Sequence, residues 1–159
     1  YLKSRFITFF NPTSDPQGAS YQIHKSLMAV GSGGLLGRGF GQSLQKFNNL
    51  PEPMGDSVFA VAGEEFGFAG AAFLVLLFTA FAWRGLWIAN RSPDIFSGLL
   101  TVGIVMLIVS QSFINMAAML NVLPLSGTAL LFVSQGGTAL LFTLAEAGII
   151  LSVSRHIRK

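Results

Sequence analysis

Long apolar runs fill most of the chain after a polar beginning. Three runs are long enough to cross a membrane as helices, because an apolar bilayer core about 30 Å thick needs roughly 20 helical residues. They are residues 66–88, 95–120 and 130–153. All but two of the seven acidic residues lie in the first 65 positions. The pattern predicts an all-α integral membrane protein, in which a polar segment (1–65) precedes three transmembrane helices (66–159).

The polar segment contains one short helical pattern. Residues 1–22 are polar and rich in proline and glycine turn signals, which predicts a loop. From Tyr21 to Val30, apolar Ile23, Leu27 and Val30 follow at close to helical spacing. We expect a short amphipathic helix that lies on the outer membrane surface.

Glycine marks two places where the backbone bends or meets another segment. Six glycines occur among the eleven residues GSGGLLGRGFG, Gly31 to Gly41. No P-loop Lys-Ser/Thr follows, and Leu36 stands where a dinucleotide fingerprint needs glycine. The run is either a hinge or a phosphate-binding loop. Gly63, Gly67 and Ala71 repeat every four residues, which predicts close approach of another helix backbone.

Composition excludes several classes of protein. Hydrophobic residues make up 52% of the 159 residues and charged residues 11%, with a mean hydropathy of +0.61. The chain has no cysteine, and His24 and His156 are far apart, so neither disulfides nor a local metal motif is expected. The net charge of +3 comes without a basic stripe, which argues against a nucleic-acid partner. The chain begins at Tyr1, inside a polar segment, and we expect that further N-terminal sequence is missing.

Basic residues predict the orientation of the chain. They flank the first connection between spans and close the chain, as Arg84, Arg91, Arg155, Arg158 and Lys159. The second connection, 121–128, has no Lys or Arg. The positive-inside rule predicts a cytoplasmic C-terminus, with residues 1–65 and 121–128 outside.

Carboxylates gather where the first apolar helix begins. The sequence turns helical and apolar from Ser57, after Glu52 and Asp56, and Glu64 and Glu65 precede the span proper. On a helix Glu64 lies about 12 Å along and about 80° round from Asp56, so both could face one cavity. Asp56 alternatively caps the helix by accepting its first free amides. Glu64 and Glu65 either line a polar cavity or start the span at the headgroup level.

Polar residues also occur inside the predicted spans. Gln111 and Asn115 share a helix face, as hydrogen-bond partners between helices or as substrate ligands. Glu146 is an ionisable group within the third span, which marks a functional site by default. It precedes Arg155 by nine residues, which favours a partly hydrated position near the inner interface instead. We do not include it among the catalytic candidates.

The run from Tyr21 to Gly70 combines GSGG, GxGxGxSxQK, LPEP, GDSVFA and EExGxxG in this order. It resembles the large extracytoplasmic loop and following helix of the FtsW/RodA glycosyltransferase family. NVLPLSGTALLFVSQGG, Asn121 to Gly137, resembles the family's last outer loop and the start of its final helix. Gln135 stands where the family commonly has tyrosine. SLQKF and LPEPMGDS favour the division-associated FtsW branch. The resemblance covers the last three spans of a ten-helix bundle.

The resemblance implies a substrate and a reaction. The substrate is lipid II, whose glycan is transferred to a sugar hydroxyl as undecaprenyl pyrophosphate leaves. Asp56 matches the family's essential loop aspartate, and we expect it to be the catalytic base. Arg38 and Lys46 are candidate contacts for the pyrophosphate, because an Arg fork and a Lys point charge both suit phosphate oxygens. The alternative for both residues is a solvated surface position. The candidate substrate-binding residues are Arg38, Lys46, Glu52, Glu64 and Ser134, with Glu52 alternatively a loop-surface group.

The resemblance also implies partners and a location. The expected partner is a monofunctional class B penicillin-binding protein, a transpeptidase, together with other division or elongation membrane proteins in the bacterial cytoplasmic membrane. No cofactor follows from the resemblance with certainty, but acidic groups around Asp56 could hold a divalent cation, so metal dependence stays open. The alternatives are a lipid II flippase, which needs a polar route through the bilayer, and a noncatalytic scaffold for the transpeptidase. Three spans do not enclose a lipid-linked substrate, so this chain alone is expected to be inactive.

Overall fold

The protein is all-helical in the residues that its computed structural model describes, which are 9, 19–44 and 53–157. No strand occurs among them. Within these described residues four helices follow one another: α2 (Ala19–Gly33), α4 (Val58–Asn90), α5 (Ile95–Met119) and α6 (Gly137–Ser154).

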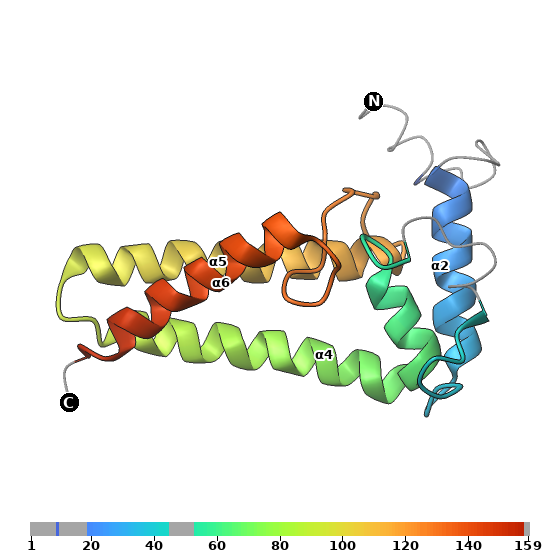
Figure 1. The fold of residues 1–159 in the computed structure, drawn as a ribbon, viewed down its shortest axis with the longest axis horizontal. Helices are drawn as coiled ribbons and strands as arrows, with labels where there is room; N and C mark the ends of the chain where they lie inside the picture. Colours follow the sequence, from blue (N-terminus) through green and yellow to red (C-terminus); the bar gives the residue numbers. More distant parts are fainter. Residues whose placement is uncertain (1–8, 10–18, 45–52, 158–159) are drawn as a thin grey trace.

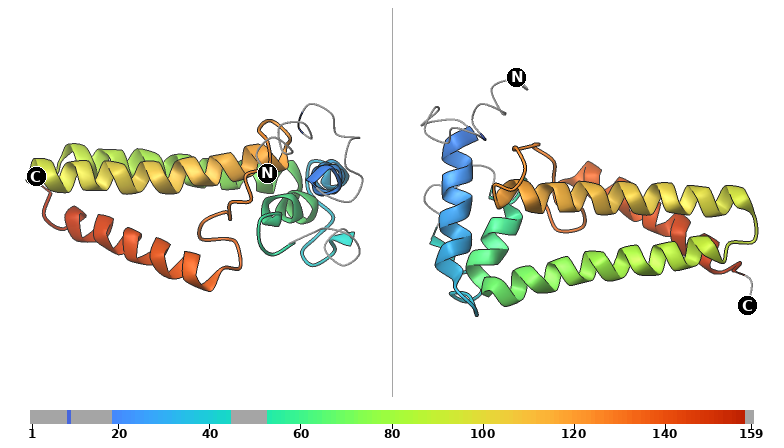
Figure 2. Two further views of the ribbon diagram at one scale, coloured as in Figure 1. Left: turned by 90° about the horizontal axis from the view of Figure 1, so that it is seen from above. Right: turned by 180° about the vertical axis from the view of Figure 1, so that it is seen from behind.

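Three long helices run side by side and α2 lies across one end of them (Figure 1). α4 and α5 are antiparallel neighbours joined by a short turn, and α6 runs along them (Figure 2). The turn between α4 and α5 lies at the same end as the C-terminus of α6, where Pro93 and Asp94 face Ser152 and His156 around one recess. The start of α4, α2 and the connection from α5 to α6 occupy the other end.

The three predicted spans are confirmed as helices that are long and apolar enough to cross a membrane. α5 (Ile95–Met119) agrees with the predicted 95–120. α6 starts at Gly137 rather than at residue 130, although residues 130–133 are apolar. Phe132 has a φ of 65°, a left-handed conformation that cannot continue a right-handed helix.

α4 bends at Gly67, whose φ of 67° and ψ of −162° are not helical. The part after the bend, from Phe68 to Asn90, rises about 34 Å at 1.5 Å per residue, enough to cross the apolar core of a bilayer. The part before it, from Val58, packs along α2 (Figure 1). The bend therefore lies next to Phe66, where the sequence predicts the span to begin.

The helix expected at Tyr21–Val30 is present as α2, but its buried face differs from the predicted one. Ile23, Ser26 and Ala29 repeat every three residues and are buried against the other helices. Leu27, expected on the apolar face, is 40% exposed. Ile23 joins a core cluster with Phe59 of α4 and with residues of α5. α2 therefore belongs to the packed fold.

Candidate functional site

Asp56 lies in a turn, residues 53–57, directly before α4 at the end of the molecule where α2 lies. The N-cap position of α4 belongs to Ser57, whose side chain makes no capping hydrogen bond. Asp56 comes one residue before the cap and is half-buried. Its position is therefore set by whatever holds the turn, and three other segments of the chain do so.

The main-chain oxygen of Asp56 is held by α5. Asn115, which is 1% exposed, donates through Nδ2 to this oxygen over 2.9 Å and also to the main-chain oxygen of Thr128. Both N–H groups of the carboxamide are thereby used. One side chain ties together the start of α4, α5 and the connection to α6.

The segment before α6 holds the two preceding carbonyl groups. Ser134 Oγ donates to the main-chain oxygen of Gly55 over 2.8 Å and accepts from the main-chain N–H of Leu130 over 2.8 Å. The main-chain N–H of Gln135 donates to the oxygen of Met54 over 2.8 Å. Three consecutive carbonyl groups of the turn are thus fixed by residues far away in the sequence.

α2 also contacts this turn. Gln22 Nε2 donates to Ser57 Oγ over 3.1 Å, and Ser57 is fully buried. The turn that carries Asp56 is therefore bound from α2, from α5 and from the segment before α6.

The glycine-rich loop, residues 34–44, follows α2 and lies against the bend of α4. A regular helix pairs the N–H of Phe68 with the oxygen of Glu64, and the N–H of Ala69 with the oxygen of Glu65. The glycine-rich segment supplies partners for all four groups instead. The bonds are Arg38 N to Glu64 O (3.0 Å), Gly39 N to Glu65 O (3.0 Å), Phe68 N to Gly34 O (2.9 Å) and Ala69 N to Leu35 O (3.1 Å).

The glycines explain how two backbones approach so closely. A Cβ on Gly33 would overlap the main-chain oxygen of Gly63, and a Cβ on Gly37 would overlap that of Glu65. A Cβ on Gly67 would overlap the amide nitrogen of Gly37. The predicted close approach of another helix backbone is confirmed at Gly63, where the neighbour is α2. At Gly67, which is not helical, the neighbour is the glycine-rich loop instead. The loop inserts its backbone into the bend of α4.

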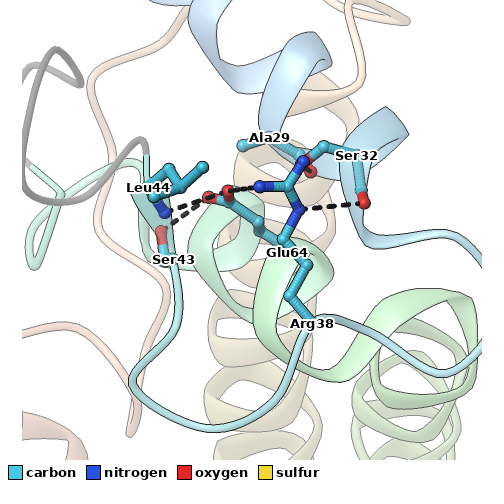
Figure 3. Close-up of polar contacts among 6 residues, drawn as sticks. All are labelled: Ala29, Ser32, Arg38, Ser43, Leu44 and Glu64. Atoms are coloured by element: carbon cyan, nitrogen blue, oxygen red, sulfur yellow. Dashed lines mark hydrogen bonds and ion pairs between the residues drawn. The ribbon is translucent and has the colours of Figure 1, made fainter.

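Glu64 fastens the end of this loop (Figure 3). Its carboxylate, 1% exposed, accepts from Ser43 Oγ over 2.6 Å and from the main-chain N–H of Leu44 over 3.1 Å. Arg38 Nη1 lies 3.9 Å from Glu64 Oε1, and Arg38 Nε donates to the oxygen of Ser32 over 3.3 Å. These bonds offset the cost of burying a carboxylate.

Glu65 is also buried, at 5% exposure, and its Oε1 has no hydrogen-bond partner among the described residues. A solvated position is therefore wrong for both Glu64 and Glu65, because the loop and α2 cover this part of α4. For Glu64 the surroundings are the loop itself.

The predicted site residues fall into two groups. Asp56 and Ser134 meet at the turn, since Ser134 binds the carbonyl group that precedes Asp56. Arg38 and Glu64 meet at the glycine-rich loop. Lys46 and Glu52 lie outside the described residues. The role of all six in substrate binding or catalysis stays a prediction.

Asn115 is the residue whose link to this site the sequence did not reveal. Its signal was a carboxamide within an apolar span, which indicates a hydrogen-bond partner but not which one. Among residues 9, 19–44 and 53–157, no group of three or more His, Asp or Glu side chains could hold a metal ion. The prediction of a divalent cation involves Glu52 as well, and it stays a prediction.

Comparison with known families gives one match along the whole chain. The family model FtsW/RodA/SpoVE, described as "Cell cycle protein", matches residues 1–159. Stage V sporulation protein E of Bacillus subtilis (strain 168) is 44% identical over 158 residues, covering 99% of this chain and 43% of that protein.

Two further similarities agree with this match. The "Probable peptidoglycan glycosyltransferase FtsW" of Geobacter sulfurreducens (strain DL-1 / KN400) is 38% identical, covering 99% of this chain and 42% of that protein. A chain in a solved structure described as "Structural coordination of polymerization and crosslinking by a peptidoglycan synthase complex" superposes with a TM-score of 0.78 at 26% identity. The superposition covers 96% of this chain and 41% of the chain in the solved structure. This chain thus spans less than half the length of these relatives.

Proposed function

This chain belongs to the FtsW/RodA/SpoVE family of cell cycle proteins, and we propose that the full-length protein containing it is a peptidoglycan glycosyltransferase that polymerises lipid II. In the proposed reaction, a sugar hydroxyl of one substrate attacks the anomeric carbon of another. A glycosidic C–O bond forms, and the bond from that carbon to the pyrophosphate breaks. Undecaprenyl pyrophosphate leaves with the electron pair, and the Asp56 carboxylate accepts the hydroxyl proton as general base.

The observation that supports Asp56 as the base is the way its turn is held. Asn115 fixes the carbonyl group of Asp56, and Ser134 fixes that of Gly55. A general base has to stay within hydrogen-bond reach of the proton that it removes, and a carboxylate on a turn held from both sides meets that demand. In the proposal, Ser134 completes the substrate-facing surface beside Asp56.

Arg38 is the proposed contact for the leaving pyrophosphate. Its side chain is 39% exposed while it lies against buried Glu64, so the side chain is accessible from outside the fold. Glu64 holds the loop and thereby the position of Arg38. Lys46 and Glu52 complete the proposed site, within a segment outside the described residues. Charge stabilisation of a developing leaving group is commonly a large term in catalysis.

The chain is part of a multi-pass membrane protein, and we propose that the membrane is the bacterial cytoplasmic membrane. Arg84 and Arg91 stand at the end of α4 where α6 also finishes, and both guanidinium groups lie 4.3 Å from the ring centre of Trp87. The positive-inside rule assigns this end to the cytoplasm. Asp56 at the opposite end then faces outward, together with the rest of residues 1–65.

A class B penicillin-binding protein is the proposed partner. The solved structure similar to this chain is described as a peptidoglycan synthase complex that coordinates polymerization and crosslinking. A transpeptidase at the outer end would receive the strands that the polymerase makes. We propose a role in division because SLQKF and LPEPMGDS resemble the FtsW branch. The relatives that match include proteins named FtsW and stage V sporulation protein E.

Lipid II polymerisation by the full-length protein with its cognate transpeptidase tests the proposal. Asp56→Asn should lower the rate by at least about 100-fold, because general bases contribute roughly 10²- to 10⁴-fold. Asp94→Asn is the matched control, since Asp94 caps α5 at the opposite end and Asn caps helices equally well. Full polymer synthesis by Asp56→Asn, at equal expression and with the complex retained, would refute the assignment.

The same experiment separates the alternatives. If the protein were a scaffold, Asp56→Asn would leave both partner binding and the activity of the partner complex unchanged. A flippase needs polar side chains along a route through the bilayer, for which Gln111, Asn115 and Glu146 are the candidates. Asn115 is 1% exposed and bound to two main-chain oxygens, so its amide nitrogen serves the fold. We therefore favour the transferase.

A further inference from the structure

The turn before α4 is fixed on both sides of the Asp56 Cα atom. Each peptide unit is planar, so the two planes that flank a Cα atom define its φ and ψ. Ser134 binds the carbonyl group of the plane before Asp56, and Asn115 binds that of the plane after it. With both planes held, the direction in which the Asp56 side chain leaves the backbone is set, and only its own rotamers remain.

Asn115 is the less replaceable of these two partners. It is buried within an apolar helix, where a polar group is costly unless it is paired. Its second N–H binds Thr128 in the connection between α5 and α6. The turned-over amide would place Oδ1 against two carbonyl oxygens, so the assignment of Nδ2 follows from its partners. No partner of Oδ1 is present within the described residues.

We propose that Asn115 is a positioning residue for Asp56: its carboxamide fixes the peptide plane after Asp56, relative to α5 and Thr128, and so directs the carboxylate toward the substrate. The inference rests on the proposed function, in which Asp56 is the base. Asn115 itself touches no reacting atom. A plain interhelical hydrogen bond, which is the alternative role, would affect the amount of folded protein but not the rate of each folded molecule.

Steady-state kinetics of the full-length protein with its transpeptidase distinguish these roles. Asn115→Leu keeps a similar volume without donors, and Asn115→Ala removes the donors in a smaller side chain in case leucine disturbs packing. Either variant should lower kcat by about 10- to 100-fold, since small misplacements of a catalytic group cost up to about 100-fold. KM for lipid II should stay within about threefold.

Ser112→Ala is the matched control. Ser112 is fully buried on the same helix, but its hydroxyl donates to the main-chain oxygen of Ile108 within α5. Its kcat should equal that of wild type. A wild-type kcat for folded Asn115→Leu and Asn115→Ala would overturn the inference.

A second background tests whether Asn115 acts through Asp56. Asp56→Glu keeps a carboxylate but displaces it by one methylene group, so the benefit of precise backbone placement is already reduced. Asn115→Leu should therefore cost a smaller factor in Asp56→Glu than in wild type, because residues that act as a unit are not additive. Equal factors in the two backgrounds would overturn the inference. Unchanged activity in Asp56→Asn would instead refute the assignment of Asp56 as the base, on which this inference rests.

Discussion

The main-chain N–H of Gly39 donates a 3.0 Å hydrogen bond to the carbonyl oxygen of Glu65, an oxygen that in an unbroken helix would accept from Ala69. The bend of α4 and the glycine-rich loop therefore satisfy each other's backbone groups. Within a membrane protein, broken helices are tolerated where other protein groups take up the freed bonds. The loop thus completes the backbone hydrogen bonding of α4, the helix that follows the Asp56 turn.

Gly37→Ala should destabilise the protein. Gly37 has a φ of 80°, and a Cβ there would overlap the main-chain oxygen of Glu65. We expect a loss of about 2 kcal/mol or more in the free energy of unfolding, from left-handed strain and overpacking. Gly31→Ala is the control, because Gly31 lies in α2 with open space around it and alanine favours a helix. Thermal unfolding of the purified full-length protein measures both, and equal midpoints would contradict the account.

Glu64→Gln should loosen the end of the glycine-rich loop. The amide keeps one oxygen, so it loses an acceptor for Ser43 or Leu44 and its charge interaction with Arg38. We expect a cost of about 1–3 kcal/mol, the usual penalty for an unsatisfied buried group. Glu65→Gln should cost less, since Oε1 of Glu65 lacks a partner among the described residues. Unfolding midpoints and limited proteolysis of residues 34–44 give the comparison; a larger effect at Glu65 would show that the loop is held differently.

The start of α5 should weaken in acid. The N–H and the hydroxyl of Ser97 donate to the Asp94 carboxylate over 2.9 Å and 2.8 Å and lower its pKa below the usual value. A carboxylate with a lowered folded-state pKa stabilises above its unfolded pKa, and the contribution disappears as pH falls through the folded value. Amide hydrogen exchange at Ser97, compared with Asp94→Asn at each pH, should show wild type losing relative protection only below the usual pKa. A constant ratio down to pH about 2 would contradict this.

The proposed orientation can be tested by labelling, because the chain has no cysteine of its own. Val122, in the connection between α5 and α6, is 63% exposed, and Asn90 is exposed at the other end of α4. In a cysteine-free full-length protein in intact cells, a membrane-impermeant maleimide should label Val122→Cys and not Asn90→Cys. Labelling of Asn90→Cys alone would show that the orientation is the opposite of the proposed one. Permeabilised cells are the control, in which both cysteines should react.

The sequence predicted the spans well because hydropathy is a local property. α5 was predicted almost to its last residue, and α4 was expected to be helical from Ser57, close to its start at Val58. The start of α6 was placed too early because residues 130–133 are apolar and hydropathy alone does not separate a helix from an apolar loop. In the structure, Ser134 and Gln135 instead donate hydrogen bonds to the turn that carries Asp56.

The candidate site was only partly readable in the same way. Asp56 stood out through its motif and its place before a helix, and Glu64 through its charge next to an apolar span. The direct bond between Asn115 and the turn joins residues 59 positions apart, and no spacing rule connects them. The burial of Glu64 and Glu65 likewise depends on a loop that precedes α4 by many residues.

The sequence by itself determined that three apolar helices form, where the backbone needs glycine and which carboxylates stand near the start of the first apolar helix. Only the tertiary structure decided that the glycine-rich loop enters the bend of α4 and that Asn115 and Ser134 hold the planes around Asp56. The physical reason is that most of the groups involved belong to the main chain. Amide and carbonyl groups are nearly the same at every residue, so the side-chain pattern does not reveal which of them will pair across the fold.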